Sequence, residues 1–168
     1  MKAKTSLRIL LILSVIFINI GCDQVSKIMV RRNIMFYETI GYFNNHLVIT
    51  KVENTGAFLS MGNGLSRSKR KILLLVIPAV FLVFGFFYLL SRSTISKTTL
   101  TGFSFVIGGG IANIFDRIFY GSVTDFLYID LGFFHTGVFN LADMSIVTGI
   151  VVVLIHFLFR KKYPALEK

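Results

Sequence analysis

The sequence has few charged residues and a single cysteine. Lys, Arg, Asp and Glu make up 15% of its 168 residues, whereas soluble domains carry roughly 25%. Hydrophobic residues account for 54%, and the mean hydropathy is +0.74. The one cysteine, Cys22, excludes an internal disulfide and a cysteine-based metal cluster. This composition indicates a membrane protein.

Long stretches of the chain lack charge almost entirely. Three of them approach the roughly 20 residues that cross a bilayer as a helix, and the first apolar stretch reaches that length if it continues into Cys22–Val30. We predict four transmembrane helices within one membrane domain that covers residues 1–168. The predicted spans are about 7–28, 72–90, 98–116 and 139–159.

The distribution of Lys and Arg indicates the orientation. No Lys or Arg occurs in residues 118–138, the loop between the third and fourth spans. Because positive residues concentrate in cytoplasmic loops, we predict that both termini are cytoplasmic and that this loop and the first loop lie outside. The net charge of +10 fits anionic lipid headgroups. We expect no nucleic-acid partner, since no basic helix or aromatic-basic RNA motif is present.

The first loop, about residues 36–64, is long enough to have structure of its own. Its segment HLVITKVE, His46–Glu53, is rich in β-branched residues and is followed by Asn54-Thr55-Gly56, a pattern typical of a strand and a turn. The predicted fold class is therefore an all-α membrane protein with a small extracytoplasmic β-sheet between spans 1 and 2. We expect residues 118–138, with glycines among phenylalanines, to be an interfacial segment that dips into the headgroups.

The stretch FINIGCDQ, Phe17–Gln24, looks like the end of a bacterial lipoprotein signal. Such a signal usually has Leu, Val or Ile three residues before the cysteine, whereas this chain has Asn19. A signal is also followed by a soluble domain rather than by three further spans. We therefore expect that the N-terminus is retained and that Cys22 is not acylated.

Acidic residues are scarce, and a carboxylate near hydrocarbon is by default a functional candidate. The chain has eight. Four of them, including Glu53, occur in loops or the tail, where solvation explains them. The other four fall near the outer ends of the four predicted spans and so converge on one layer: Asp23, Asp116, Asp125 and Asp143.

The third span carries two patterns. Small residues recur every four positions and form a smooth face for a neighbouring helix: Ser104, Gly108 and Ala112. Asn113, Asp116 and Arg117 follow with i, i+3, i+4 spacing, which places them together on the helix surface. Alternatively, Asp116 and Arg117 only pair with each other or with neighbours to close the helix end.

Asp125 and Asp143 flank the third loop, and a hairpin through that loop could bring them face to face. Two poorly solvated carboxylates share one proton, so the pair can supply a base and an acid for attack of water on an amide. Alternatively, Asp143 only stabilises the N-terminus of the fourth helix. His156 is too far along that helix to assist, and no Ser or Cys stands beside a candidate base as a nucleophile.

Five short motifs, in this order, resemble the lipoprotein signal peptidases (signal peptidase II), a family of four-span aspartic proteases of the bacterial membrane. The motifs are Asp23-Gln24 with Lys27, Asn54 with Gly56-Ala57-Phe58, Asn113 with Asp116-Arg117, Gly121 and Val123 with Asp125-Phe126, and Phe139-Asn140 with Ala142-Asp143. Two positions depart from the family pattern. Ala112 stands where Gly is usual, and Phe58 stands where many members have a second Ala.

The resemblance implies an aspartic endopeptidase that cuts diacylglyceryl-modified prolipoproteins before the lipidated cysteine, with Asp125 and Asp143 as the catalytic dyad. It implies that Asp23 and Lys27 support the site from the first span. It implies no metal or cofactor. Further residues would bind substrate or orient the dyad: Asn54, Gly56, Asn113, Asp116, Arg117 and Asn140.

The resemblance also implies a multi-pass protein of the bacterial cytoplasmic (inner) membrane with its active site on the outer side. Membrane lipids are the other expected partner, and we expect a monomer. We predict that Phe58 and Met61, which follow the Asn54 turn, lie at the bilayer surface and close over the signal peptide.

Alternative functions make different predictions. A small multi-span transporter would show repeated halves or broken helices, and a presenilin-type protease would carry G-x-G-D on a span; neither pattern is visible. A membrane scaffold without protease activity predicts that substitution of Asp125 leaves cellular lipoprotein processing intact.

Overall fold

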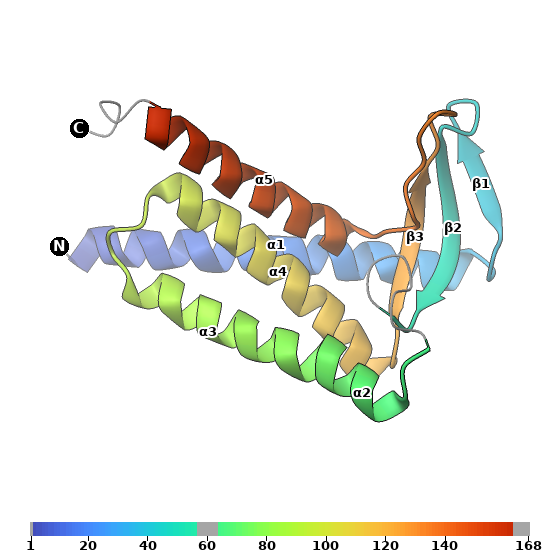
Figure 1. Cartoon of the computed structure of the whole chain (residues 1–168), viewed down its shortest axis with the longest axis horizontal. Coiled ribbons are helices and arrows are strands. Elements are labelled where there is room, and N and C mark those ends of the chain that lie inside the picture. Colours follow the sequence, from blue (N-terminus) through green and yellow to red (C-terminus); the bar gives the residue numbers. More distant parts are fainter. Residues whose placement is uncertain (1, 57–63, 163–168) are drawn as a thin grey trace.

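The computed structural model describes residues 2–56 and 64–162, with side chains for 6–56 and 64–159. Four long helices form a bundle, and a small sheet crosses one end of it (Figure 1). The described chain begins and ends at the opposite end of the bundle. Phe58 and Met61 lie outside the described residues, so their place at the bilayer surface stays a prediction.

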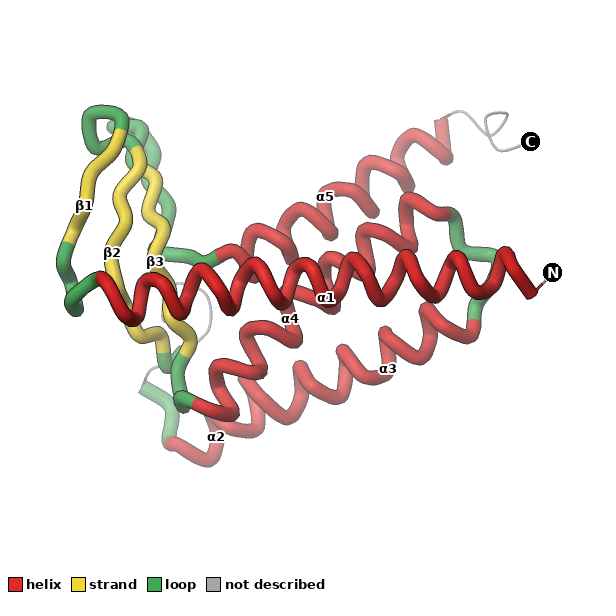
Figure 2. Tube along the Cα trace, turned by 180° about the vertical axis from the view of Figure 1, so that it is seen from behind, coloured by secondary structure: helices red, strands yellow, loops and turns green. Residues whose placement is uncertain are grey.

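The four-helix prediction is confirmed. The first helix is α1 (Lys2–Asn33), which runs the whole length of the bundle and reaches the sheet (Figure 2). The third and fourth long helices are α4 (Lys97–Phe119) and α5 (Leu141–Lys162). Among the described residues, four helical segments are long and apolar enough to cross a membrane: Ser6–Asn33, Arg67–Ser91, Lys97–Phe119 and Leu141–Phe159.

The second span is a composite of three helical pieces. It consists of α2 (Arg67–Lys71), the π-helical turn η2 (Ile72–Val76) and α3 (Ile77–Ser91). Pro78 is at the start of α3 and has no N–H to donate to the preceding turn. A π-helical turn directly before a proline accommodates this missing hydrogen bond without ending the helix.

The sheet has three antiparallel strands in the order β1-β2-β3. They are β1 (Thr39–Tyr42), β2 (Leu47–Asn54) and β3 (Val123–Ile129). The small sheet and the strand predicted at His46–Glu53 are confirmed. The sheet is not confined to the first loop, however, because its third strand comes from residues 118–138. That segment was expected to be interfacial only, but VTDFLYI is β-branched and aromatic and pairs with β2.

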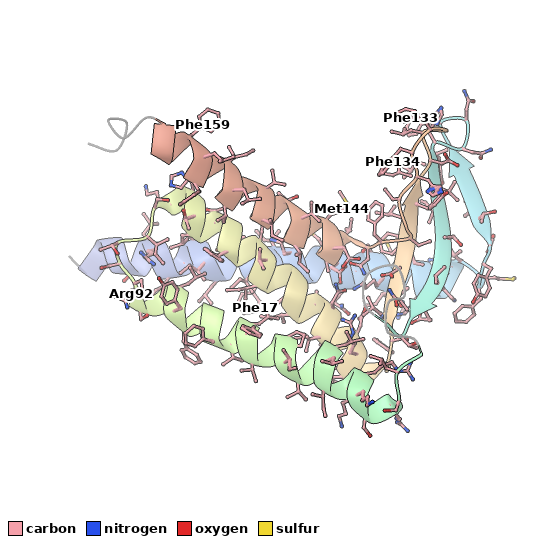
Figure 3. All side chains as sticks on the ribbon, viewed as in Figure 1. Phe17, Arg92, Phe133, Phe134, Met144 and Phe159 are labelled. Carbon is pink, nitrogen blue, oxygen red and sulfur yellow. The ribbon has the colours of Figure 1, made fainter. Side chains whose placement is uncertain are left out.

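Small residues let α4 pack closely against its neighbours. A Cβ added to Gly108 would lie 2.9 Å from the Cβ of Asn19 in α1, so the predicted smooth face contacts α1. On another side of α4, a Cβ on Gly109 would collide with the carbonyl of Ala142 in α5. The side chains on the outside of the bundle are apolar, as Phe17 and Phe159 show (Figure 3). This is the pattern of helices packed on one another and surrounded by lipid.

Candidate active site

The polar residues gather where the helix bundle meets the sheet. Asp23 lies in α1, Asp116 in α4, Asp125 in β3 and Asp143 in the first turn of α5. Asp23 and Asp116 are completely buried, and Asp125 is 3% exposed. The fold therefore brings together four carboxylates that are up to 120 positions apart in the sequence, at the end of the bundle next to the sheet (Figure 1).

Asp125 is held by two asparagine amides. Asn54 Nδ2 donates to its Oδ2 over 2.9 Å, and Asn140 Nδ2 donates to its Oδ1 over 2.6 Å. Burial and the nearby Asp143 charge raise the pKa of Asp125 to about 6, although the two amide hydrogen bonds oppose this rise. Asp125 can therefore exchange a proton near neutral pH.

Asp143 is part of a reciprocal cap on α5. Its N–H donates to Asn140 Oδ1 over 2.9 Å, and the Asn140 N–H donates to Asp143 Oδ2 over 3.3 Å, which is the arrangement of a capping box. Its other oxygen accepts from Asn113 Nδ2 over 2.8 Å. Asp143 therefore does stabilise the N-terminus of α5, as the alternative interpretation held. The same carboxylate also faces the polar layer that contains Asp125.

Two asparagines connect these carboxylates. Asn140 is completely buried; its amide nitrogen reaches Asp125, and its amide oxygen accepts from the N–H of Asp143. The same nitrogen also lies 3.3 Å from Asn113 Oδ1. Amides are neutral, so they orient both carboxylates without cancelling their charge.

Lys27 organises a second, buried cluster behind the amides. Its Nζ lies 2.7 Å from Asp23 Oδ2 and 2.9 Å from Asp116 Oδ2, with all three side chains 0% exposed. Lys27 also donates to Asn113 Oδ1 over 3.0 Å. All three protons of the ammonium group therefore have acceptors, which a buried charge requires. Asp23 Oδ1 in turn accepts the Ala142 N–H over 2.8 Å and so ties α1 to α5.

Arg117 extends from α4 towards the turn after β2. Its Nη2 donates to the Gly56 carbonyl over 3.0 Å and its Nη1 to the Asn113 carbonyl over 3.4 Å. Asn54 Oδ1 accepts the Gly56 N–H over 2.9 Å. The ion pairs of Asp116 are with Lys27 and Arg31, not with Arg117. The structure thus places every predicted site residue in one hydrogen-bonded region.

Sequence reasoning missed several members of this region. Glu53 was explained by solvation, and this is wrong: within the predicted strand, now β2, its carboxylate accepts hydrogen bonds from the Ser122 and Thr124 hydroxyls. Gln24, quoted only as part of a motif, donates to Asp116 Oδ1 over 3.0 Å. Arg31, four residues after Lys27 and hence on the same helix face, was also missed. Within residues 2–56 and 64–162, no group of three or more His, Cys, Asp or Glu side chains is arranged to hold a metal ion.

Comparison with known proteins gives consistent matches over most of the chain. Residues 15–159 match the family model described as signal peptidase (SPase) II. A protein named lipoprotein signal peptidase from Borrelia hermsii is 36% identical over 154 residues, which cover 87% of this chain and 88% of that protein. One of the same name from Clostridioides difficile is 36% identical over 150 residues, which cover 89% and 96%.

The fold also matches a solved structure described as a bacterial membrane enzyme. The TM-score is 0.75 at 22% sequence identity, and the match covers 97% of this chain and 92% of that one. At this identity the likeness concerns the fold, and it supports a multi-pass membrane protein.

Proposed function

Because this chain belongs to the signal peptidase II family, we propose that Asp125 and Asp143 are the catalytic dyad with which it cuts lipoprotein signal peptides. The chain is a peptidase, and its substrates are prolipoproteins, cut before the lipidated cysteine. The observation that carries the dyad assignment is the shared asparagine: Asn140 binds both aspartates, one of which is buried with a pKa of about 6.

The surroundings of the two aspartates suggest a division of roles. Asp143 lies at the N-terminus of α5 and accepts from Asn113, and a helix N-terminus favours negative charge. Asp125 is enclosed in β3, and its raised pKa favours retention of a proton. We therefore assign Asp143 as the base and Asp125 as the acid.

The reaction uses only these carboxyl groups and one water molecule. Asp143 removes a proton from the water as its oxygen attacks the scissile carbonyl carbon, while protonated Asp125 donates a hydrogen bond to the carbonyl oxygen. When the tetrahedral intermediate collapses, a proton passes to the nitrogen of the leaving amine and the C–N bond breaks. Asn54, Asn113 and Asn140 keep the carboxylates oriented throughout.

The remaining polar residues support the site. Asp23, Lys27 and Asp116 form a buried ion cluster that fixes α1 against α4 and α5. Arg117 holds the carbonyl of Gly56 at the end of the turn, and this turn leads into the segment expected to contact the signal peptide.

Cleavage of a purified diacylglyceryl-modified precursor by the purified protein in detergent tests this function. The parent should release the signal peptide immediately before the modified cysteine, as read by mass spectrometry, and should leave an unmodified precursor uncut. Asp125→Asn and Asp143→Asn should be almost inactive. Asp130→Asn is the matched control, because the carboxylate of Asp130 accepts the Gly132 N–H in an exposed turn, which an asparagine oxygen can also accept. Full activity of Asp125→Asn would rule out the dyad.

We further propose that the site faces the outside of the bacterial inner membrane, that both termini are cytoplasmic and that the enzyme acts as a monomer. In a Cys22→Ala background, a cysteine introduced by Phe133→Cys near the sheet should react with an impermeant maleimide added to intact cells. One introduced by Arg92→Cys at the opposite end of the bundle (Figure 3) should react only after lysis. The reverse pattern would invert the proposed topology.

A further inference from the structure

Arg31 lies at the outer end of α1, and its guanidinium group is held on three sides. Its Nε donates to Thr124 Oγ1 over 2.8 Å, and its Nη2 lies 3.1 Å from Asp116 Oδ1. Its Cζ lies 3.8 Å from the centroid of the Tyr120 ring. The side chain is only 17% exposed. A planar guanidinium group with two polar partners and a stacked ring has a fixed orientation, which a lysine could not reproduce.

Thr124 transmits this constraint to β3. It is completely buried, accepts from Arg31 and donates to Glu53 Oε1 over 2.7 Å. A threonine hydroxyl has one proton to donate, so these two bonds fix its direction. The second oxygen of Glu53 accepts from the Ser122 hydroxyl, which ties the same carboxylate to the residue just before β3.

Thr124 is also the neighbour of Asp125 in the chain. Successive side chains of a strand point to opposite faces, so Thr124 is held from the side of α1 while Asp125 faces Asn54 and Asn140. Among the described residues, β3 is an edge strand with β2 as its one neighbouring strand, and only the bridge between Leu127 and Phe139 pairs with its other side. The bond to Arg31 connects β3 directly to a membrane helix.

We propose that Arg31 is a positioning residue for peptide cleavage, which fixes the β3 backbone at Asp125 through the hydroxyl of Thr124. This inference rests on the proposed role of Asp125 in catalysis. Misplacement of a catalytic carboxyl group by about 1 Å can lower the rate roughly 100-fold. The hydrogen bond from Arg31 to Thr124, the residue before Asp125, therefore has a direct effect on turnover.

Through its charge, Arg31 also affects the residues that bind Asp143. It shares Asp116 with Lys27, and Lys27 donates to Asn113, which in turn binds Asp143. Loss of the guanidinium group would leave Lys27 as the only cationic partner of Asp116 among the described residues. The ammonium group would then be drawn towards Asp116 and away from Asn113.

Two pairs of variants test the proposal. Thr124→Val keeps the shape of the side chain but removes the hydroxyl, whereas Thr124→Ser keeps the hydroxyl. Arg31→Lys keeps the charge but cannot reach both partners, and Arg32→Lys makes the same change at the exposed neighbouring residue. We expect Thr124→Val and Arg31→Lys each to lower kcat about tenfold, as for loss of a hydrogen bond to a charged group. KM should stay within about twofold, because an interaction that aligns only the dyad affects the chemical step.

Thr124→Ser and Arg32→Lys should behave like the parent, and the double variant Arg31→Lys/Thr124→Val should be no worse than the poorer single variant. A purely structural role would instead lower the thermal unfolding midpoint and leave kcat per folded molecule unchanged. That result would overturn the proposal.

Hydrogen exchange provides a readout that does not depend on activity. Amides of residues 123–129 should exchange about tenfold faster in Thr124→Val and Arg31→Lys than in Thr124→Ser, while amides of α4 and α5 stay unchanged. If the parent cleaves no lipidated precursor, the proposed function is wrong, and the exchange data still decide whether Arg31 holds β3. Parental exchange rates in both variants would refute the positioning role.

Discussion

Replacement of Asp125 with asparagine should change how stability depends on pH. In the unfolded chain this carboxyl group titrates near 3.8, and burial in the folded protein raises its pKa to about 6. The folded state therefore binds the proton more tightly than the unfolded chain does. This contribution to stability is complete below about pH 4 and is lost as the pH rises through 6. The separation corresponds to about 3 kcal/mol in the free energy of unfolding, and at 3% exposure little of it is screened by solvent.

The asparagine variant escapes this loss but has a different cost. Asn54 and Asn140 both donate to Asp125, so an asparagine at this position presents its own amide hydrogens to one of them. The two amides cannot simply turn, because the Asn54 and Asn140 oxygens already accept the N–H groups of Gly56 and Asp143. A buried donor without an acceptor costs roughly 1–3 kcal/mol. Asp125→Asn should thus be less stable than the parent at pH 4 and as stable or more stable at pH 8.

Unfolding in mixed micelles, followed by circular dichroism from pH 4 to 8.5, measures this difference. The free energy of unfolding of Asp125→Asn minus that of the parent should rise by up to about 3 kcal/mol, with most of the rise between about pH 4 and 6 and its midpoint at about pH 5. Asp130→Asn should show no such step. A difference that does not change between pH 4 and 8 would refute the conclusion that the folded protein raises the pKa of Asp125.

The other predictions concern the dyad, its support, the loop and the N-terminus. Asp143→Asn should lower turnover by several orders of magnitude, and the double variant with Asp125→Asn should be little worse, because the residues act as one unit. Asp116→Asn should lower the free energy of unfolding by about 3–5 kcal/mol, since it removes one member of a buried ion cluster, and should leave residual cleavage. If Asp143→Asn instead cuts normally while a folded Asp116→Asn is inactive, the dyad is wrongly assigned. The chain has no tryptophan, so Phe133→Trp provides a single fluorophore. If residues 118–138 dip into the interface, lipids brominated near the headgroup should quench the fluorescence of this tryptophan more than that of soluble N-acetyltryptophanamide. Intact mass should show an unmodified Cys22 and every residue before it; a lipidated product that starts at the cysteine would overturn the topology.

The amino-acid sequence by itself determined the parts of the protein that depend on local pattern. The four helices could be predicted because a bilayer requires long apolar segments. The small-residue face of α4 follows from helical spacing, and β2 from its β-branched run between turn residues. The candidate dyad could be named because acids are rare in this chain and each has to be explained, and the family resemblance supplied the remaining roles.

Tertiary structure decided everything that depends on contacts between distant residues. Strand β3 exists because β2 offers it an edge to pair with, and no local pattern in residues 118–138 indicates that β2 is its partner. The partners of Glu53 were missed for the same reason, since the Ser122 and Thr124 hydroxyls that bind it lie about 70 positions further along the chain. Arg31 and Thr124 are 93 positions apart. The packing of whole elements determines which partner a buried polar side chain has. The sequence pattern around each residue does not indicate which element lies opposite.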